Sequence, residues 1–132
     1  MPAKDSFDYA IVRVVPYVER GEFLNAGVIL FCRTKRFLAA RIYLDRHRLA
    51  ALAPDFDPAQ VEAHLALIPC ICQGGPKAGP LGLWSQAERF HWLVSPRSTA
   101  IQISAVHSGI CVDPEAALDR LFEQLVQPKI VD

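Results

Sequence analysis

The sequence predicts an α+β domain, in which an antiparallel sheet of about four strands carries helices packed mainly on one face. Three short segments rich in β-branched and aromatic residues follow one another before residue 44, and their connections are too short for helical crossovers. From residue 46 onward apolar residues recur at helical spacing, interrupted by one strand-like segment at 99–107. With 132 residues, of which 52% are hydrophobic, the chain is expected to bury one core as a single domain, 1–132.

The first strand is predicted over Phe7–Val18, a segment dense in Tyr, Ile and Val, as in a strand buried on both faces. Arg13 lies in its middle, so its charge must be paired or must reach a rim of the fold. Pro16 cannot donate to a ladder, which indicates a strand end or a sheet edge close by. Two further strands, over residues 28–33 and 37–43, follow through turns that fit antiparallel pairing.

Up to four helices are predicted in the rest of the chain, each marked by a proline or a capping residue. They cover residues 46–53, 58–69, 85–92 and 114–127. In the second of them Pro69 is expected to end the helix. Trp84, Phe90 and Trp92 lie at near-helical spacing and are interpreted as core-facing aromatics rather than as a base-stacking surface.

Charge and composition exclude several classes of protein. The 14 basic and 14 acidic residues balance, so no global field attracts nucleic acid or an anionic membrane. No secretory leader precedes Cys32, Cys70, Cys72 and Cys111, so reduced thiols and a cytoplasmic location are expected. No apolar run approaches the roughly 20 residues that span a bilayer. Because Cys70 and Cys72 lack zinc-knuckle spacing, no metal or cofactor is expected.

Polar residues embedded in apolar segments mark the candidate site. In the segment 96–109, which is expected to be covered on both faces, Gln102 and Ser104 need hydrogen-bond partners. The preceding Arg97-Ser98-Thr99 combines a guanidinium fork with hydroxyl donors, which suits a phosphate or a carboxylate. The ligand-binding candidates are Arg13, Glu22, Asn25, Arg97, Ser98, Thr99, Gln102, Ser104 and His107. The structural alternative is that Arg97 pairs with Glu19 or Glu22.

Three functions are consistent with these residues. The first is a small accessory or binding module that recognises an anionic small molecule or a protein partner through these candidates. The second is a hydrolase or nuclease in which His107 is the general base and Ser104, Ser98 or a water is the nucleophile, although no nucleophile elbow or triad spacing is present. The third is nucleic-acid binding through the basic segment 33–48. A homodimer through sheet edges also stays open.

Two motifs resemble a known family. The first runs from YAIVRVVP at 9–16 through Glu19 to EFLNAGVIL at 22–30. The second joins RF at 89–90, PRST at 96–99, QIS at 102–104, HSG at 107–109 and DP at 113–114. Together they resemble short stand-alone bacterial proteins grouped as a domain of unknown function. The resemblance implies no assigned reaction and no transferable site residues. Through neighbouring genes it implies an accessory role beside a kinase similar to the HipA toxin family.

Overall fold

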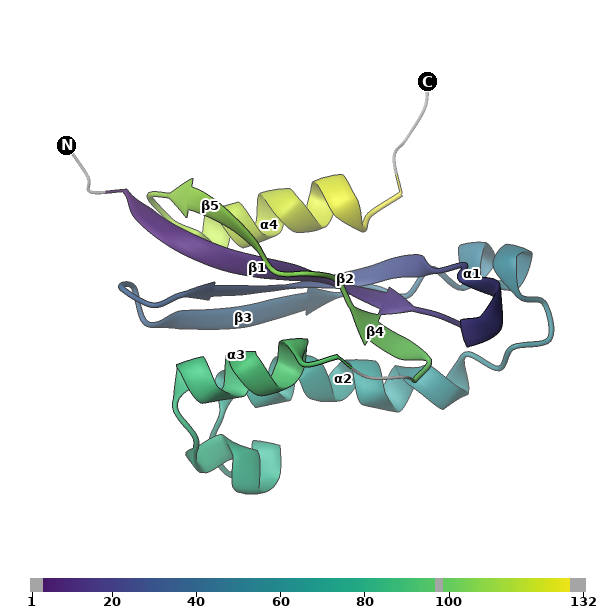
Figure 1. The fold of residues 1–132 in the computed structure, drawn as a ribbon, viewed down its shortest axis with the longest axis horizontal. Coiled ribbons are helices and arrows are strands. Elements are labelled where there is room, and N and C mark those ends of the chain that lie inside the picture. The colour runs from purple at the N-terminus through teal and green to yellow at the C-terminus, as the bar shows by residue number, and fades with distance from the viewer. Residues whose placement is uncertain (1–3, 97–98, 129–132) are drawn as a thin grey trace.

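In the part of the chain that the structure describes, residues 4–96 and 99–128, a five-stranded sheet lies between two layers of helices (Figure 1). The structure is a computed structural model. The strands are β1 (Asp5–Val14), β2 (Leu24–Cys32), β3 (Phe37–Ile42), β4 (Ile101–Ile103) and β5 (His107–Cys111). The helices are α1 (Arg46–Leu52), α2 (Ala59–Gln73), α3 (Gln86–Val94) and α4 (Pro114–Leu125), with the 3-10 helices η1 (Val18–Arg20) and η2 (Pro76–Leu83). The predicted α+β class is confirmed.

Strand β1 is the centre of the sheet. All its pairings are antiparallel, with β2 along one edge and both β5 and β4 along the other. β5 pairs with residues 5–9 of β1, and β4 pairs with residues 12–14. The one strand expected over 99–107 is therefore two strands, separated by residues 104–106. This break explains why the described sheet has five strands rather than four.

The alternation of side chains along the strands divides the core into two parts. Val12 and Ile29 belong to the cluster that packs against α2 and α3. Phe7, Val28 and Leu30 belong to the cluster that packs against α4, on the other face of the sheet. Figure 1 shows α4 on one side of the strands and α2 with α3 on the opposite side. The central strands are thus buried on both faces, which their composition predicts.

Helix α2 continues through Pro69 and ends at Gln73, so the prediction that Pro69 ends it is wrong. A proline inside a helix costs about 3 kcal/mol relative to alanine. Leu65 and Ile68 before the proline and Ile71 after it are all buried in the core. Burying such a side chain contributes about 1.5–3 kcal/mol, so packing on both sides of Pro69 offsets its cost.

The end of α2 is held by the buried side chain of Arg89, which is only 7% exposed. Its Nη1 donates to the carbonyl oxygens of Ile71 at 2.8 Å and Cys72 at 2.5 Å, and its Nε donates to that of Trp84 at 3.1 Å. Carbonyl groups at a helix C-terminus carry partial negative charge, which stabilises the buried positive charge of the guanidinium. Gly74 leaves room for it, because a Cβ there would lie 2.9 Å from Nη1.

Replacing Arg89 with leucine is expected to lower the free energy of unfolding by about 2–4 kcal/mol, because three carbonyl groups would lose their donor. Chemical denaturation followed by circular dichroism measures this change. The control is Arg48→Leu at an exposed arginine, which is expected to change stability by less than about 0.5 kcal/mol. Similar losses in both variants would contradict the role given to Arg89.

Candidate functional site

The strand register brings four predicted site residues to one face of the sheet. Asn25 on β2, Arg13 on β1 and Gln102 on β4 are successive cross-strand neighbours, here named the polar row. Cross-strand neighbours direct their side chains to the same face. His107 on β5 lies on this face farther along β1. The Asn25 Nδ2 donates to the carbonyl oxygen of Leu125 at 3.1 Å, so this is the face that carries α4.

Arg13 is half-buried and has no charged partner. Its guanidinium carbon lies 4.3 Å from the centroid of the Phe23 ring, a cation–π contact. No ion pair within residues 4–96 and 99–128 includes Arg13. In the same residues the buried Arg13 Nε has no acceptor and the buried Asn25 Oδ1 has no donor. The polar row therefore contains a donor and an acceptor, on neighbouring residues, that the described residues leave unsatisfied.

Ser104 joins the sheet where β4 and β5 separate. Its Oγ accepts the N–H of Ile11 at 2.8 Å and donates to the carbonyl oxygen of Ala105 at 2.9 Å. Its N–H donates to the carbonyl oxygen of Ile11 at 2.9 Å. The hydroxyl oxygen thus takes the place of a backbone carbonyl as the acceptor for Ile11. The hydroxyl proton is engaged with the carbonyl of Ala105. Within the described residues no hydrogen bond joins Ser104 to His107, so the geometry does not prepare a serine nucleophile.

Two further candidates lie at the surface. The exposed His107 ring stacks beside Tyr9, with 5.3 Å between ring centroids. Glu22 pairs with Arg20 at 2.5 Å, and both side chains are largely exposed. Exposed ion pairs contribute little to stability or to a site. These placements give His107 an aromatic neighbour and give Glu22 a basic partner, Arg20, outside the polar row.

The proposed anion cradle at 97–99 is only partly placed. Arg97 and Ser98 lie outside the described residues. The Thr99 hydroxyl donates to the carbonyl oxygen of Ile101 at 2.6 Å, and its own carbonyl accepts from Gln102 Nε2 at 3.3 Å. Thr99 therefore forms a local turn before β4, and its side chain borders a groove on the face opposite to the polar row.

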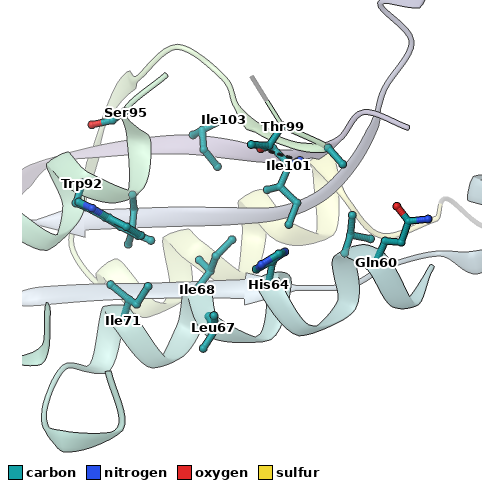
Figure 2. Close-up of a pocket in the computed structure, with 13 residues that line it drawn as sticks. Gln60, His64, Leu67, Ile68, Ile71, Trp92, Ser95, Thr99, Ile101 and Ile103 are labelled. Carbon is teal, nitrogen blue, oxygen red and sulfur yellow. Dashed lines mark hydrogen bonds between the residues drawn. The ribbon is translucent and has the colours of Figure 1, made fainter. Parts of the chain in front are cut away.

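This apolar groove has a volume of about 350 Å³ and lies between α2, α3 and the segment of β4. Figure 2 shows Leu67 and His64 from α2, Trp92 from α3 and Ile103 from β4 around the same space. Among the described residues none of its lining side chains is Lys, Arg, Asp or Glu. Sequence reasoning missed the groove because its walls come from elements that are far apart in the chain.

The two tryptophans at the groove side of the molecule do not face the core, so that prediction is wrong for them. Trp84 is 41% and Trp92 is 36% exposed, whereas Phe90 is 4% exposed. The buried face of α3 is formed by Arg89, Phe90 and Leu93. Trp92 is two residues from Phe90, so it points about 200° around the helix from it. That spacing was a signal in the sequence that Trp92 leaves the core face.

Three of the six Lys and Arg side chains in the basic segment 33–48 form ion pairs with acidic side chains elsewhere in the fold. Lys35, Arg41 and Arg46 form ion pairs with Asp5, Asp119 and Glu62, respectively. These acidic partners lie on three different elements, β1, α4 and α2. Half of the six basic side chains are thus neutralised locally, which gives no support to phosphate-backbone recognition.

The cysteines are small apolar side chains in this fold, with Cys32, Cys72 and Cys111 buried. Burial raises the pKa of the Cys72 thiol to about 12, although nearby Arg89 lowers it in part. Burial also raises the pKa of the Cys111 thiol. Both therefore stay protonated at neutral pH. The described residues contain no group of three His, Cys, Asp or Glu side chains placed to hold a metal ion. Of the helices described, none has the length and apolar character to cross a membrane.

The fold and its two surfaces, a polar row and an apolar groove, define a small α+β domain with candidate binding sites on opposite faces of one sheet. Over residues 9–126 the chain matches the family described as "Protein of unknown function (DUF3037)", and it belongs to that family. The expected membership of a family without an assigned function is thereby confirmed. A search of curated proteins and a search of solved structures returned no match.

Replacing Ser104 with alanine is expected to destabilise the protein by about 1–2 kcal/mol, because the buried N–H of Ile11 would lose its acceptor. The control is Ser108→Ala, since the Ser108 hydroxyl bonds only the Asp8 carboxylate at an exposed site. That variant is expected to change stability by less than about 0.5 kcal/mol. Urea denaturation compares the two, and a Ser104 variant as stable as the Ser108 variant would refute the assignment.

Proposed function

We propose that the protein is a binding module that holds an apolar segment of a protein partner in the groove between α2, α3 and β4. The observation that supports this most is the combination of volume and lining, about 350 Å³ with largely apolar walls and no charged side chain in the described part. Concave apolar sites with a few polar groups are the usual binding sites of proteins. The proposal refines the accessory or binding role that the sequence suggests.

The chemistry of the groove favours a neutral ligand over an anion. Its polar lining consists of Gln60, His64, Ser95 and Thr99, which are hydrogen-bonding groups at the border of the apolar walls. An anion placed there would lose water without meeting a fixed positive charge in the described residues. A peptide, in contrast, brings apolar side chains for the walls and backbone groups for the polar border.

The shape of the exposed apolar surface favours a polypeptide over a small molecule. Leu67 and Trp92 border the groove and are 50% and 36% exposed. Trp92 also borders a second hollow with Trp84, His91 and Glu88, so exposed aromatic surface continues along α3 beside one carboxylate. Small-molecule sites enclose most of their ligand, whereas extended surfaces with tryptophan suit protein contacts. The HipA-like kinase implied by the resemblance stays a prediction for the identity of the partner.

A peptide library displayed on phage is expected to yield binders that share two or more large apolar residues. Leu67→Asp is expected to weaken the binding of a selected peptide by at least about tenfold, because a carboxylate would be buried against apolar side chains. Isothermal titration calorimetry measures the affinity. The matched control is Leu83→Asp, because Leu83 is 90% exposed and lies outside the groove.

Equal affinities of the Leu67→Asp and Leu83→Asp variants would place the peptide elsewhere and contradict the proposal. A library that yields no binder to the folded protein would contradict it as well. Amide chemical shifts in NMR spectra verify that both variants retain the fold before affinities are compared.

A further inference from the structure

The polar row on the α4 face carries an inference that is independent of the groove. We infer that Arg13 and Asn25 form a binding site for a carboxylate with an N–H group beside it. This chemistry occurs at the C-terminal residue of a peptide and in a free amino acid. Three features support this site: the charge of Arg13, the buried Nε atom of Arg13 that lacks an acceptor, and the hydrogen bond that holds the Asn25 amide.

The charge of Arg13 calls for an anion. An arginine side chain stays protonated in proteins, and a partly buried charge without a counter-ion is unfavourable. The Phe23 ring stabilises one face of the guanidinium, but a cation–π contact does not use its N–H groups. Within residues 4–96 and 99–128 no carboxylate pairs with Arg13, so its charge is open to an anion from outside this part of the chain.

The atom without an acceptor indicates how that anion docks. It is Nε, which is buried within the described structure. A carboxylate that approaches an arginine from the side accepts from Nε and from the adjacent Nη with its two oxygens. This bidentate arrangement satisfies the buried N–H and gives the charged contact a fixed direction. The site is therefore expected to select a planar two-oxygen anion.

Asn25 adds the requirement for an N–H group. Its Nδ2 is engaged with the Leu125 carbonyl, so turning the amide over would place Oδ1 against that carbonyl. Oδ1 therefore points away from that carbonyl, and it is a buried acceptor without a donor in the described residues. Cross-strand neighbours have Cβ atoms about 4.5–5.5 Å apart, so one amino-acid unit can contact both side chains. Its carboxylate would bind Arg13 and its N–H would donate to Asn25.

The experiment follows the Nε–H resonance of Arg13 by NMR while the wild-type protein is titrated with small probes. N-acetylglycine carries both groups, propionate carries only the carboxylate, and N-acetylglycinamide carries the amide without the charge. N-acetylglycine is expected to shift the resonance saturably, and propionate is expected to bind about fivefold more weakly. N-acetylglycinamide is expected to cause no saturable shift. Free glycine, compared with N-acetylglycine, distinguishes an amino acid from a peptide C-terminus as the source.

Variants test the two residues separately. Arg13→Gln is expected to weaken N-acetylglycine binding by at least about tenfold, since the charged pair is lost. Asn25→Ala is expected to reduce it to the level of propionate. Arg33→Gln is the matched control, because Arg33 also lies over a ring, that of Phe31 at 5.8 Å, but is exposed. This control is expected to leave the affinity unchanged.

Three results would overturn the inference. The first is an Arg13 Nε–H resonance that does not respond to any probe. The second is equal binding of all carboxylates, with or without an N–H group. The third is a wild-type spectrum that shows a direct hydrogen bond from Arg13 Nε to Asn25 Oδ1, which would satisfy both atoms without a ligand. If a variant fails to fold, the wild-type titration still decides. Failure here leaves the groove proposal untouched, because the groove lies on the other face and shares no residue with Arg13 or Asn25.

Discussion

The arrangement of both surfaces depends on how β1 shares one edge between β4 and β5. Residues 104–106 lie between the two short strands, and Ser104 bonds both the carbonyl and, through its hydroxyl, the N–H of Ile11 at that break. The pairing fixes the register of β4 against residues 12–14 of β1. Since successive side chains of a strand point to opposite faces, a slip by one residue would exchange the faces of β4. Gln102 would then leave Arg13, and Ile101 and Ile103 would leave the groove.

The three-residue strand β4 therefore contributes to both candidate sites at once. Its middle residue, Gln102, extends the polar row, and its outer residues, Ile101 and Ile103, line the apolar groove. The two surfaces have opposite chemistry because each face of the sheet meets a different layer. On one face α2 and α3 leave a groove beside β4 whose described lining has no Lys, Arg, Asp or Glu side chain. On the other face the polar row reaches α4 at its C-terminal end, where Asn25 bonds the carbonyl of Leu125.

Much of the fold follows from local patterns, and most of the site does not. The first three strands and the capping of α3 by Ser85 with Glu88 follow from composition and spacing over a few residues. The continuation of α2 past Pro69 does not, because it depends on core contacts made on both sides of the proline. The sequence singled out Arg13, Asn25 and Gln102 as polar residues in apolar segments. Only the long-range register could show that they are neighbours, while the equally conspicuous Ser104 completes the backbone ladder.

In the described residues, the Ser104 hydroxyl and the Cys72 thiol are not arranged as nucleophiles beside a base. Covalent catalysis needs a nucleophile within hydrogen-bond reach of a base. The Ser104 hydroxyl uses its proton on a backbone carbonyl, and burial raises the pKa of the Cys72 thiol to about 12. His64 lies in the groove among apolar side chains, where the described lining offers no carboxylate to orient it. Among residues 4–96 and 99–128, the two faces supply an apolar groove, the Arg13 guanidinium without an ion pair and the Asn25 amide oxygen without a donor. These are the features on which the two proposed binding roles rest.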